Sequence, residues 1–186
     1  MKAIQVLRDE HQYILRMLKV VRGFSIHTFK TQEVYYKGFH DAIDFIRNYA
    51  DKFHHGKEED ILFLKMSSEL GKAIEQGPIF GMLAEHDLGR LHIKTLEEAL
   101  HAAEAGDEDA KVDIIANAIS YTDLLYRHID KEDNAIFNFA ESQLSQESLQ
   151  TLDVDFEAAK ERLASDTTEK KYVQLLEELE ATLASL

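Results

Sequence analysis

Residues 54–63 read HHGKEEDILF, and residues 128–137 read HIDKEDNAIF. At identical offsets both stretches place a His, a Lys, a Glu, a second acid, an aliphatic residue and a Phe. Residues four apart lie on one face of an α-helix, so the His and the Glu of each stretch can bind one metal ion or two neighbouring ions. Two helices that present the same ligand pair are what a dinuclear metal site needs, and imidazole with carboxylate suits iron or manganese, and zinc less exclusively.

The alignment of the two stretches also decides between two overlapping His–Glu pairs. His54 and Glu58 are in register with the second stretch, whereas His55 and Glu59 are out of register by one residue. We therefore assign the metal to His54 and Glu58. Glu59 and its counterpart Asp133 are expected either to hydrogen-bond the ligands or to be ordinary surface acids.

Two further histidines lie on the apolar stripes of other predicted helices. His11 follows the helical spacing of Leu7, and His86 follows that of Leu83. A lone core histidine needs only a hydrogen bond, so neither position is decisive alone. One inward histidine on each of four helices, two of them with a paired carboxylate, favours a metal site. The predicted ligands are His11, His54, Glu58, His86, His128 and Glu132.

The chain has 186 residues with one proline and eight glycines, a composition that favours long amphipathic helices. Apolar residues recur at helical spacing in four long segments, roughly 4–21, 34–63, 79–105 and 109–144, with a turn expected from Gly23 to Gln32. Short connections between long helices predict an all-α, up-down-up-down four-helix bundle over residues 1–145. Residues 146–186 are predicted to add C-terminal helices, and residues 1–186 to form a single domain.

Charge and cysteine content exclude several classes of function. The net charge of −14 disfavours nucleic acid and an anionic membrane surface as partners. The absence of cysteine excludes disulfides, thiolate metal sites and cysteine nucleophiles. The N-terminus lacks the pattern of a signal peptide and no apolar run is long enough to cross a bilayer, so the expected location is the cytoplasm.

The motifs HHGKEEDILF, GPIFGMLAEHD and RHIDKEDNAIF resemble those of the hemerythrin-like (HHE cation-binding) domain family over roughly residues 1–145. The resemblance implies a four-helix bundle that holds two irons, bridged by both carboxylates and an oxo or hydroxo group, with manganese or zinc as substitutes. It also implies small partners such as O2, NO or peroxide, and uses in sensing, iron handling or the response to oxidative or nitrosative stress. A redox partner would accompany such chemistry.

One position departs from the oxygen-carrying members of that family, which place a further histidine four residues after the one on the third helix. Here that residue is Arg90, which cannot ligate a metal while protonated. The implied set is therefore four His and two Glu, which disfavours simple oxygen carriage. The same set is similar to that of di-iron cluster-repair proteins, but the cysteine-containing segment that those usually carry is lacking here.

Several alternatives stay open at this stage. A di-iron oxidoreductase or an iron–sulfur cluster repair protein would use the same residues, so sequence cannot decide whether the protein is an enzyme. A ferritin-like bundle needs two Glu-x-x-His motifs, and only Glu98 with His101 matches. A metal-free helical interaction module would leave the repeated pairs unexplained. The remaining histidines are expected to be structural or on the surface: His27, His40, His92 and His101.

Overall fold

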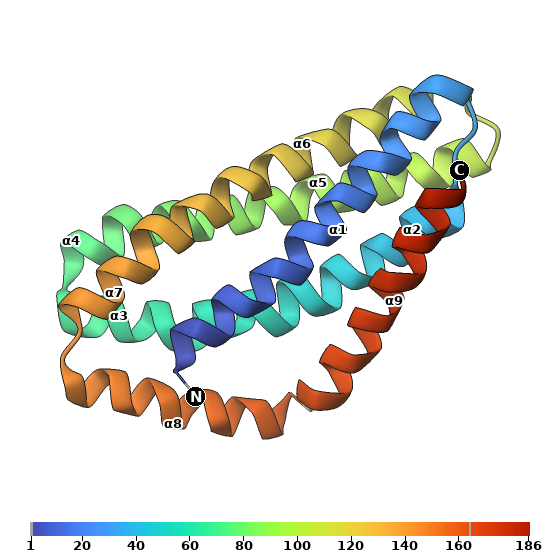
Figure 1. The fold of residues 1–186 in the computed structure, drawn as a ribbon. Coiled ribbons are helices and arrows are strands. Elements are labelled where there is room, and N and C mark those ends of the chain that lie inside the picture. The colour runs from blue at the N-terminus through green and yellow to red at the C-terminus, as the bar shows by residue number, and fades with distance from the viewer. Residues whose placement is uncertain (1, 164) are drawn as a thin grey trace.

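The computed structural model describes residues 2–163 and 165–186, and among these it contains helices and no strands. Four long helical segments run alternately up and down, and two more helices follow on one side (Figure 1). The first segment is α1 (Ala3–Thr31) and the second joins α2 (Tyr36–Phe45), η1 (Ile46–His55), η2 (Glu58–Phe63) and α3 (Leu64–Leu70). The third joins α4 (Lys72–Ile74), η3 (Glu75–Ile79) and α5 (Phe80–Glu104), and the fourth joins α6 (Ala110–Lys131), η4 (Glu132–Ile136) and α7 (Phe137–Gln143).

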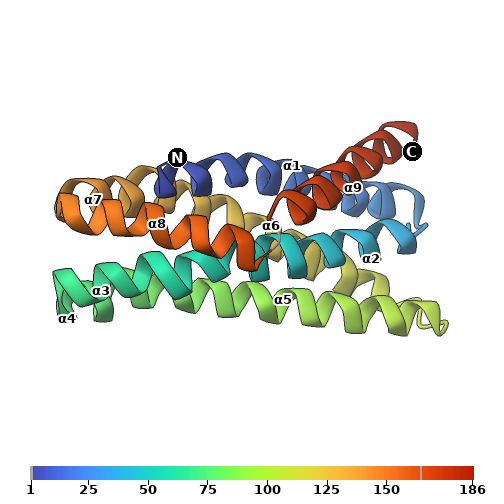
Figure 2. The same ribbon diagram turned by 90° about the horizontal axis from the view of Figure 1, so that it is seen from below.

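The C-terminal extension consists of α8 (Gln146–Arg162) and α9 (Ser165–Ser185). Ser145 caps the start of α8, because its Oγ accepts a hydrogen bond from the amide of Ser148 at 3.2 Å. The extension packs against the first two segments, with α8 on α1 and η2 and α9 on α1, α2 and η1 (Figure 2). The predicted all-α bundle with additional C-terminal helices is confirmed.

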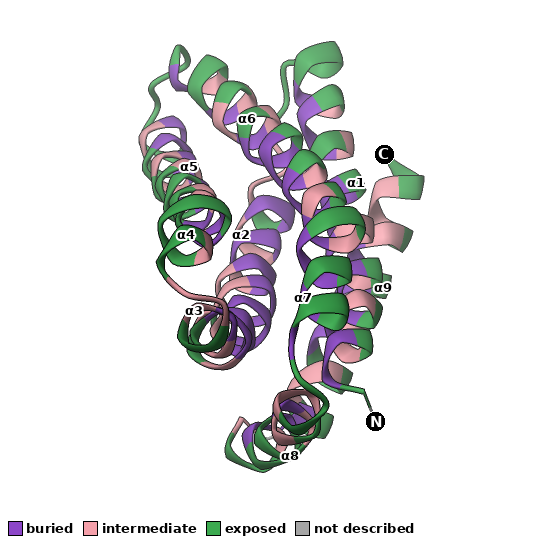
Figure 3. Cartoon of the chain, turned by 90° about the vertical axis from the view of Figure 1, so that its left-hand side faces the viewer, coloured by how far each residue is buried: buried purple, intermediate pink, exposed green. Residues whose placement is uncertain are grey.

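The buried face of each long segment points toward the interior of the bundle, and the exposed face points outward (Figure 3). The apolar core is divided into two clusters. One contains Ile14, Phe45 and Ile93, and the other contains Leu7, Phe63 and Met82. Along the first three segments the predicted ligands fall between these two clusters, and on the fourth Glu132 does so while His128 lies directly beside Ile129 of the first cluster. Two apolar layers therefore flank the polar centre.

The first helix is longer than the sequence predicted. It continues through Gly23 to Thr31, and the chain turns at Gln32, which has a positive φ of 63°. Gly23 has another role, because a Cβ at this position would lie 2.4 Å from a methyl carbon of Leu183. The glycine allows α9 to approach α1 closely and does not mark a turn.

Three π-helical stretches carry predicted ligands: η1 ends with His54 and His55, η2 begins at Glu58, and η4 begins at Glu132. A π-turn bonds residue i to i+5, so successive side chains diverge less than the 100° of an α-helix. The wider turn lets His54 and His55 both face the interior, where both are buried. π-turns of this kind occur frequently at functional sites.

No helix in the described residues is both long enough and apolar enough to cross a bilayer.

Candidate metal centre

All six predicted ligands are buried, and the structure brings them together from the four long segments. His11 comes from α1, His54 and Glu58 from the second segment, His86 from α5, and His128 and Glu132 from the fourth segment. The side chains of Glu58 and Glu132 have no solvent exposure. Two clusters of potential ligand atoms result: His11 with His54, Glu58 and Glu132, and His86 with His128 and His55.

Glu58 lies between the two clusters. Its Oε1 is 3.4 Å from Nε2 of His54, and its Oε2 is 3.7 Å from Nε2 of His86. One carboxylate therefore offers one oxygen to each cluster, which is the arrangement of a bridging ligand.

Glu132 spans the same gap from the opposite side. Its Oε2 is 3.3 Å from Nε2 of His11, and its Oε1 is 3.2 Å from Nε2 of His128. We define the first position as the space among His11, His54 and one oxygen of each glutamate. The second position is bounded by His86, His128 and the other two oxygens.

Most of these inward atoms have no partner in the protein. Nε2 of His11, Nε2 of His54 and all four carboxylate oxygens of Glu58 and Glu132 are buried and make no hydrogen bond within the described residues. Orphaned buried atoms of this kind are costly, and a cluster of them calls for an unplaced ion. Imidazole nitrogens and carboxylate oxygens are the donor set that divalent iron, manganese or zinc takes, so the residues present fit a metal.

A carboxylate holds the outer nitrogen of each of the four predicted histidines. Nδ1 of His11 lies 2.8 Å from Asp133, and Nδ1 of His86 lies 2.7 Å from Glu59. Nδ1 of His54 lies 2.9 Å from Glu10, and Nδ1 of His128 lies 2.9 Å from Glu85. An ionised carboxylate only accepts, so Nδ1 carries the proton and Nε2 faces the centre. Carboxylate–imidazole pairs fix metal-binding histidines in the same way. Glu59 and Asp133 are therefore partners of the predicted ligands and not plain surface acids.

Glu10 and Glu85 were not found from the sequence, nor was the role of the lysines. Lys57 contacts Glu10, and Lys131 contacts Glu85, at the same offset within the two repeated stretches. The available signal was the Glu-His dipeptide, which occurs at residues 10–11 and again at residues 85–86. The centre thus has an approximate two-fold arrangement in which each half repeats a His, a Lys and two acids.

Charge in the centre is carried by imidazoles. Burial lowers the pKa of His11, but the carboxylates of Asp133 and Glu132 outweigh burial and raise it to about 10. Burial likewise lowers the pKa of His128, and Glu132 with Glu58 reverses this and raises it to about 9. Without metal, protons on these rings compensate the buried carboxylates, since no Lys or Arg of the described residues pairs with Glu58 or Glu132.

The second position holds two ring nitrogens very close together. Nε2 of His86 lies 3.0 Å from Nε2 of His128. Two lone pairs at this distance repel, so either a shared proton or a metal ion must lie between the rings. The arrangement could therefore hold a metal ion.

A pocket of about 340 Å³ adjoins the second position. It is lined by His55, His86 and Arg90 together with apolar residues that include Ile93 and Tyr121. The guanidinium of Arg90 forms ion pairs with Asp51, Glu59 and Asp87. The rings of His55 and His86 thus form part of the wall of this pocket.

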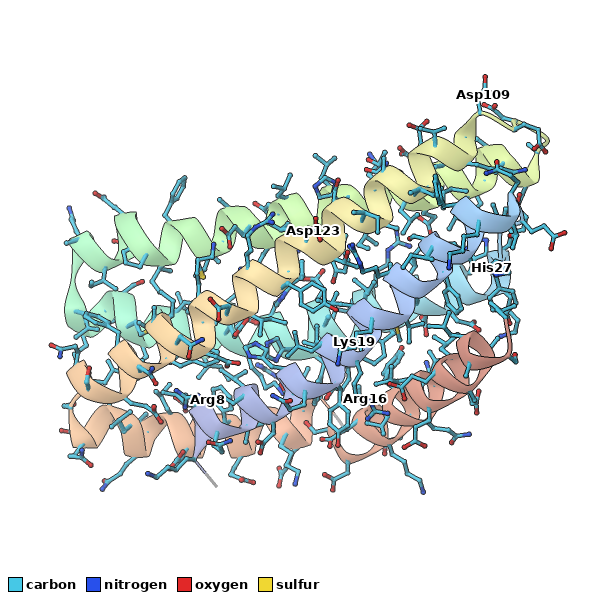
Figure 4. All side chains as sticks on the ribbon, turned by 45° about the horizontal axis from the view of Figure 1, so that its top comes forward. Arg8, Arg16, Lys19, His27, Asp109 and Asp123 are labelled. Carbon is cyan, nitrogen blue, oxygen red and sulfur yellow. The ribbon has the colours of Figure 1, made fainter. Side chains whose placement is uncertain are left out.

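The other histidines lie outside the centre. His27 lies near the C-terminal end of α1, far along that helix from Arg8 (Figure 4). His40 bonds Glu104 at 3.0 Å in a partly exposed cluster with His101 on α2 and α5. His92 is partly buried, with its Nδ1 3.4 Å from Asn117.

Comparison with known families gives one match, the hemerythrin HHE cation binding domain, over residues 2–140. The chain belongs to this family. The matched range covers the four long segments and every predicted ligand of this hemerythrin-family domain, and it ends before α8. Neither the comparison with curated proteins nor the comparison with solved structures gave a match. The hemerythrin-family domain therefore has buried His and Glu clusters that could bind metal.

Proposed function

We propose that the protein binds two iron ions and uses them to take up O2, NO or peroxide, in sensing, in iron handling or in the response to oxidative or nitrosative stress. His11 and His54 would hold the first ion, His86 and His128 would hold the second, and Glu58 and Glu132 would offer one carboxylate oxygen to each. The observation that carries the proposal is the set of buried Nε2 and carboxylate atoms that face one another without protein partners. Manganese or zinc would fit the same donors.

The residues around the ligands prepare the centre before any metal arrives. Each acid at Nδ1 fixes a ring so that Nε2 faces inward, and it raises the basicity of that nitrogen. The two bridging glutamates leave each ion short of a full set of protein ligands. The iron pair, when bound, supplies redox chemistry and a coordination position for a small oxidant or for NO.

The burial of the centre limits which molecules can reach it. The two apolar clusters exclude bulk water along the bundle axis, and the low dielectric strengthens each charge interaction inside. Access is left through the pocket beside His55 and His86. Small neutral molecules enter such a site more readily than large or charged ones.

A second candidate function is a di-iron oxidoreductase, which includes repair of iron–sulfur clusters. The pocket favours this candidate, because about 340 Å³ holds a molecule larger than a diatomic gas. Steady turnover of peroxide or NO by the iron-loaded protein would support it. A metal-free interaction module is a weaker candidate, because it leaves the orphaned atoms unexplained.

The proposal is tested by loading the metal-free protein anaerobically with ferrous iron, manganese or zinc and measuring the bound metal per chain. Optical spectra are then recorded before and after exposure to O2 and NO. We expect two equivalents of iron and new absorption on exposure. His92→Gln is the matched control, because this histidine lies on α5 outside the centre. A wild-type protein that binds no metal would overturn the proposal.

A further inference from the structure

His55 lies at the second position although it falls out of register with the repeated motif. It is buried, and the potential ligand atoms of His55, His86 and His128 lie within 4.8 Å of one another. We propose that His55 supplies a third imidazole to the second position, so that the two metal positions are unequal. This inference rests on the proposed function, because it concerns the same pair of ions.

The surroundings of His55 resemble those of the four predicted histidine ligands. Its Nδ1 lies 3.4 Å from a carboxylate oxygen of Asp51, one helical turn earlier. That distance is longer than the 2.7–2.9 Å at the other four rings. Each of the five imidazoles thus has an acid near its outer nitrogen, but at His55 this nitrogen makes no hydrogen bond within the described residues. An acid near Nδ1 favours the proton on that atom and leaves Nε2 for a metal.

Arg90 connects the acids of two of these rings. Its Nη2 lies 2.7 Å from Asp51 and 2.7 Å from Glu59, and Glu59 in turn accepts from Nδ1 of His86. A guanidinium suits two neighbouring carboxylates because its donors are fixed in one plane. Arg90 therefore does not ligate, but acts as a positioning residue for His55 and His86.

The ring of His55 needs a small movement to bind an ion. It stacks on His86 with ring centroids 3.8 Å apart and 9° between the planes, so the two rings point in nearly parallel directions. Binding one ion together requires His55 to tilt away from this stack. The pocket beside it provides the space, and the long distance to Asp51 can shorten as the ring turns.

The first position has no equivalent of His55. At the same offset the second motif has Ile129, which belongs to the apolar core and cannot ligate. The two positions therefore have three and two imidazoles around the same pair of bridging carboxylates. An ion with fewer protein ligands exchanges more readily and binds external ligands more readily. We therefore expect the ion at the first position to exchange faster and to bind the external ligand.

The test uses cobalt(II) as a spectroscopic probe, titrated anaerobically into the metal-free full chain. Wild type, His55→Gln and the control His92→Gln are compared by calorimetry and by visible absorption. We expect wild type and the control to bind two equivalents. In His55→Gln the tighter of the two binding steps, which fills the three-imidazole second position in wild type, weakens on the order of ten-fold to a hundred-fold, and the weaker step is unchanged. X-ray absorption then shows fewer imidazoles per cobalt.

A second variant guards against misfolding of His55→Gln. Asp51→Asn keeps the imidazole and removes the charge beside it, so we expect a smaller weakening, again of the tighter binding step alone. Two unchanged binding steps in both variants, with folded metal-free proteins by circular dichroism, would overturn the role of His55 and leave the proposed function intact. A wild type that binds no cobalt and no iron would instead refute the proposed function.

Discussion

The two halves of the centre make the same contacts in different surroundings. In the first half, Glu10 holds His54 and pairs with Lys57, and the Glu10 and Lys57 side chains are each 4% exposed. In the second half, Glu85 holds His128 and pairs with Lys131, with side-chain exposures of 26% and 43%. The difference arises from the C-terminal extension, because α8 and α9 cover the first two segments.

The comparison shows that the same ion pair, repeated in both halves, need not contribute the same amount to the free energy of unfolding. An ion pair shielded from water cannot be screened, so each of its charges depends on the other. The same pair near the surface is solvated and contributes little. The covered half should therefore depend more strongly on its ion pair, while the open half adjoins the pocket beside His55 and His86.

The largest effect on metal binding is expected at Glu58 and Glu132, because these two residues face both metal positions and so belong to both halves. Glu58→Ala and Glu132→Ala should each lose at least one metal ion, because each removes a ligand from both positions. The stabilisation by metal should fall accordingly, from about 4 kcal/mol when free metal is a thousand-fold above Kd. The measurement is bound metal per chain together with Tm with and without iron.

The matched control for these variants is Glu98→Ala, which removes a surface acid that lies 3.8 Å from Lys94. It should keep both ions and the full metal-dependent rise in Tm. Retention of two ions in either bridging variant would contradict the ligand assignment.

The second effect separates the two halves directly. Lys57→Met leaves Glu10 buried without its cation and should cost about 3–5 kcal/mol of unfolding free energy. Lys131→Met should cost less than about 1 kcal/mol, because Glu85 remains partly solvated. Chemical denaturation of the metal-free proteins measures both values.

A double variant sharpens this result. Removing both charges with Glu10→Gln and Lys57→Met should recover part of the loss, because no buried charge is then left without a partner. Equal destabilisation by the two lysine substitutions would show that the extension does not set the environment of the pair.

The third effect is a dependence on pH: the Tm of the metal-free protein should fall as pH rises, whereas its affinity for metal should rise. The pKa of His11 is raised to about 10 and that of His128 to about 9, so both rings gain stability for the folded, metal-free state by binding protons. That contribution is complete below about pH 6.5, the ordinary pKa of histidine, and is lost as pH rises through about 9 to 10. Tm of the metal-free protein should therefore fall over this range.

Metal competes with the same protons, so its affinity should rise as pH increases, and binding at neutral pH should release protons. Cobalt titrations between about pH 6 and 8 in lightly buffered solution measure both quantities. Metal affinity that does not change with pH would mean that the rings are already unprotonated in the metal-free centre.

The smallest effect on stability is expected at Arg90, which has no counterpart in the first half. Arg90→His should change the unfolding free energy by no more than about 1 kcal/mol, because its ion pairs are partly exposed. The new imidazole lies one turn beyond His86 and would compete with His55 for the second position. We expect a slower or more reversible reaction with O2, measured as the autoxidation rate of the iron-loaded protein. An unchanged rate and spectrum would count against the role given to this position.

The sequence could predict that these six side chains lie together because they follow helical spacing and because one motif occurs twice; their role as ligands stays a prediction. The acids that orient them could not all be placed in this way. Glu10 is adjacent to His11 in sequence but contacts His54 on another segment. A neighbouring residue on a helix points about 100° away, so its partner depends on which helix packs there and at what tilt.

Two other features depended on information that periodicity does not contain. His55 faces inward because η1 is π-helical, and a hydrophobic pattern read at 3.6 residues per turn places it off the stripe. Gly23 suggested a turn, but it accommodates Leu183 of a helix that lies far away in sequence. In both cases local rules were overridden by the packing of distant parts of the chain.

The acids at Nδ1 cross between the two helical hairpins, and this has a consequence for assembly. Asp133, on the last long segment, orients His11 on the first, and Glu59 of the first hairpin orients His86 of the second. Neither hairpin alone can prepare both of its imidazoles, so high-affinity metal binding becomes possible only after the hairpins have docked in register. On the proposed function, bound metal would therefore report that the tertiary structure is correct, and a misassembled chain would bind no metal with high affinity.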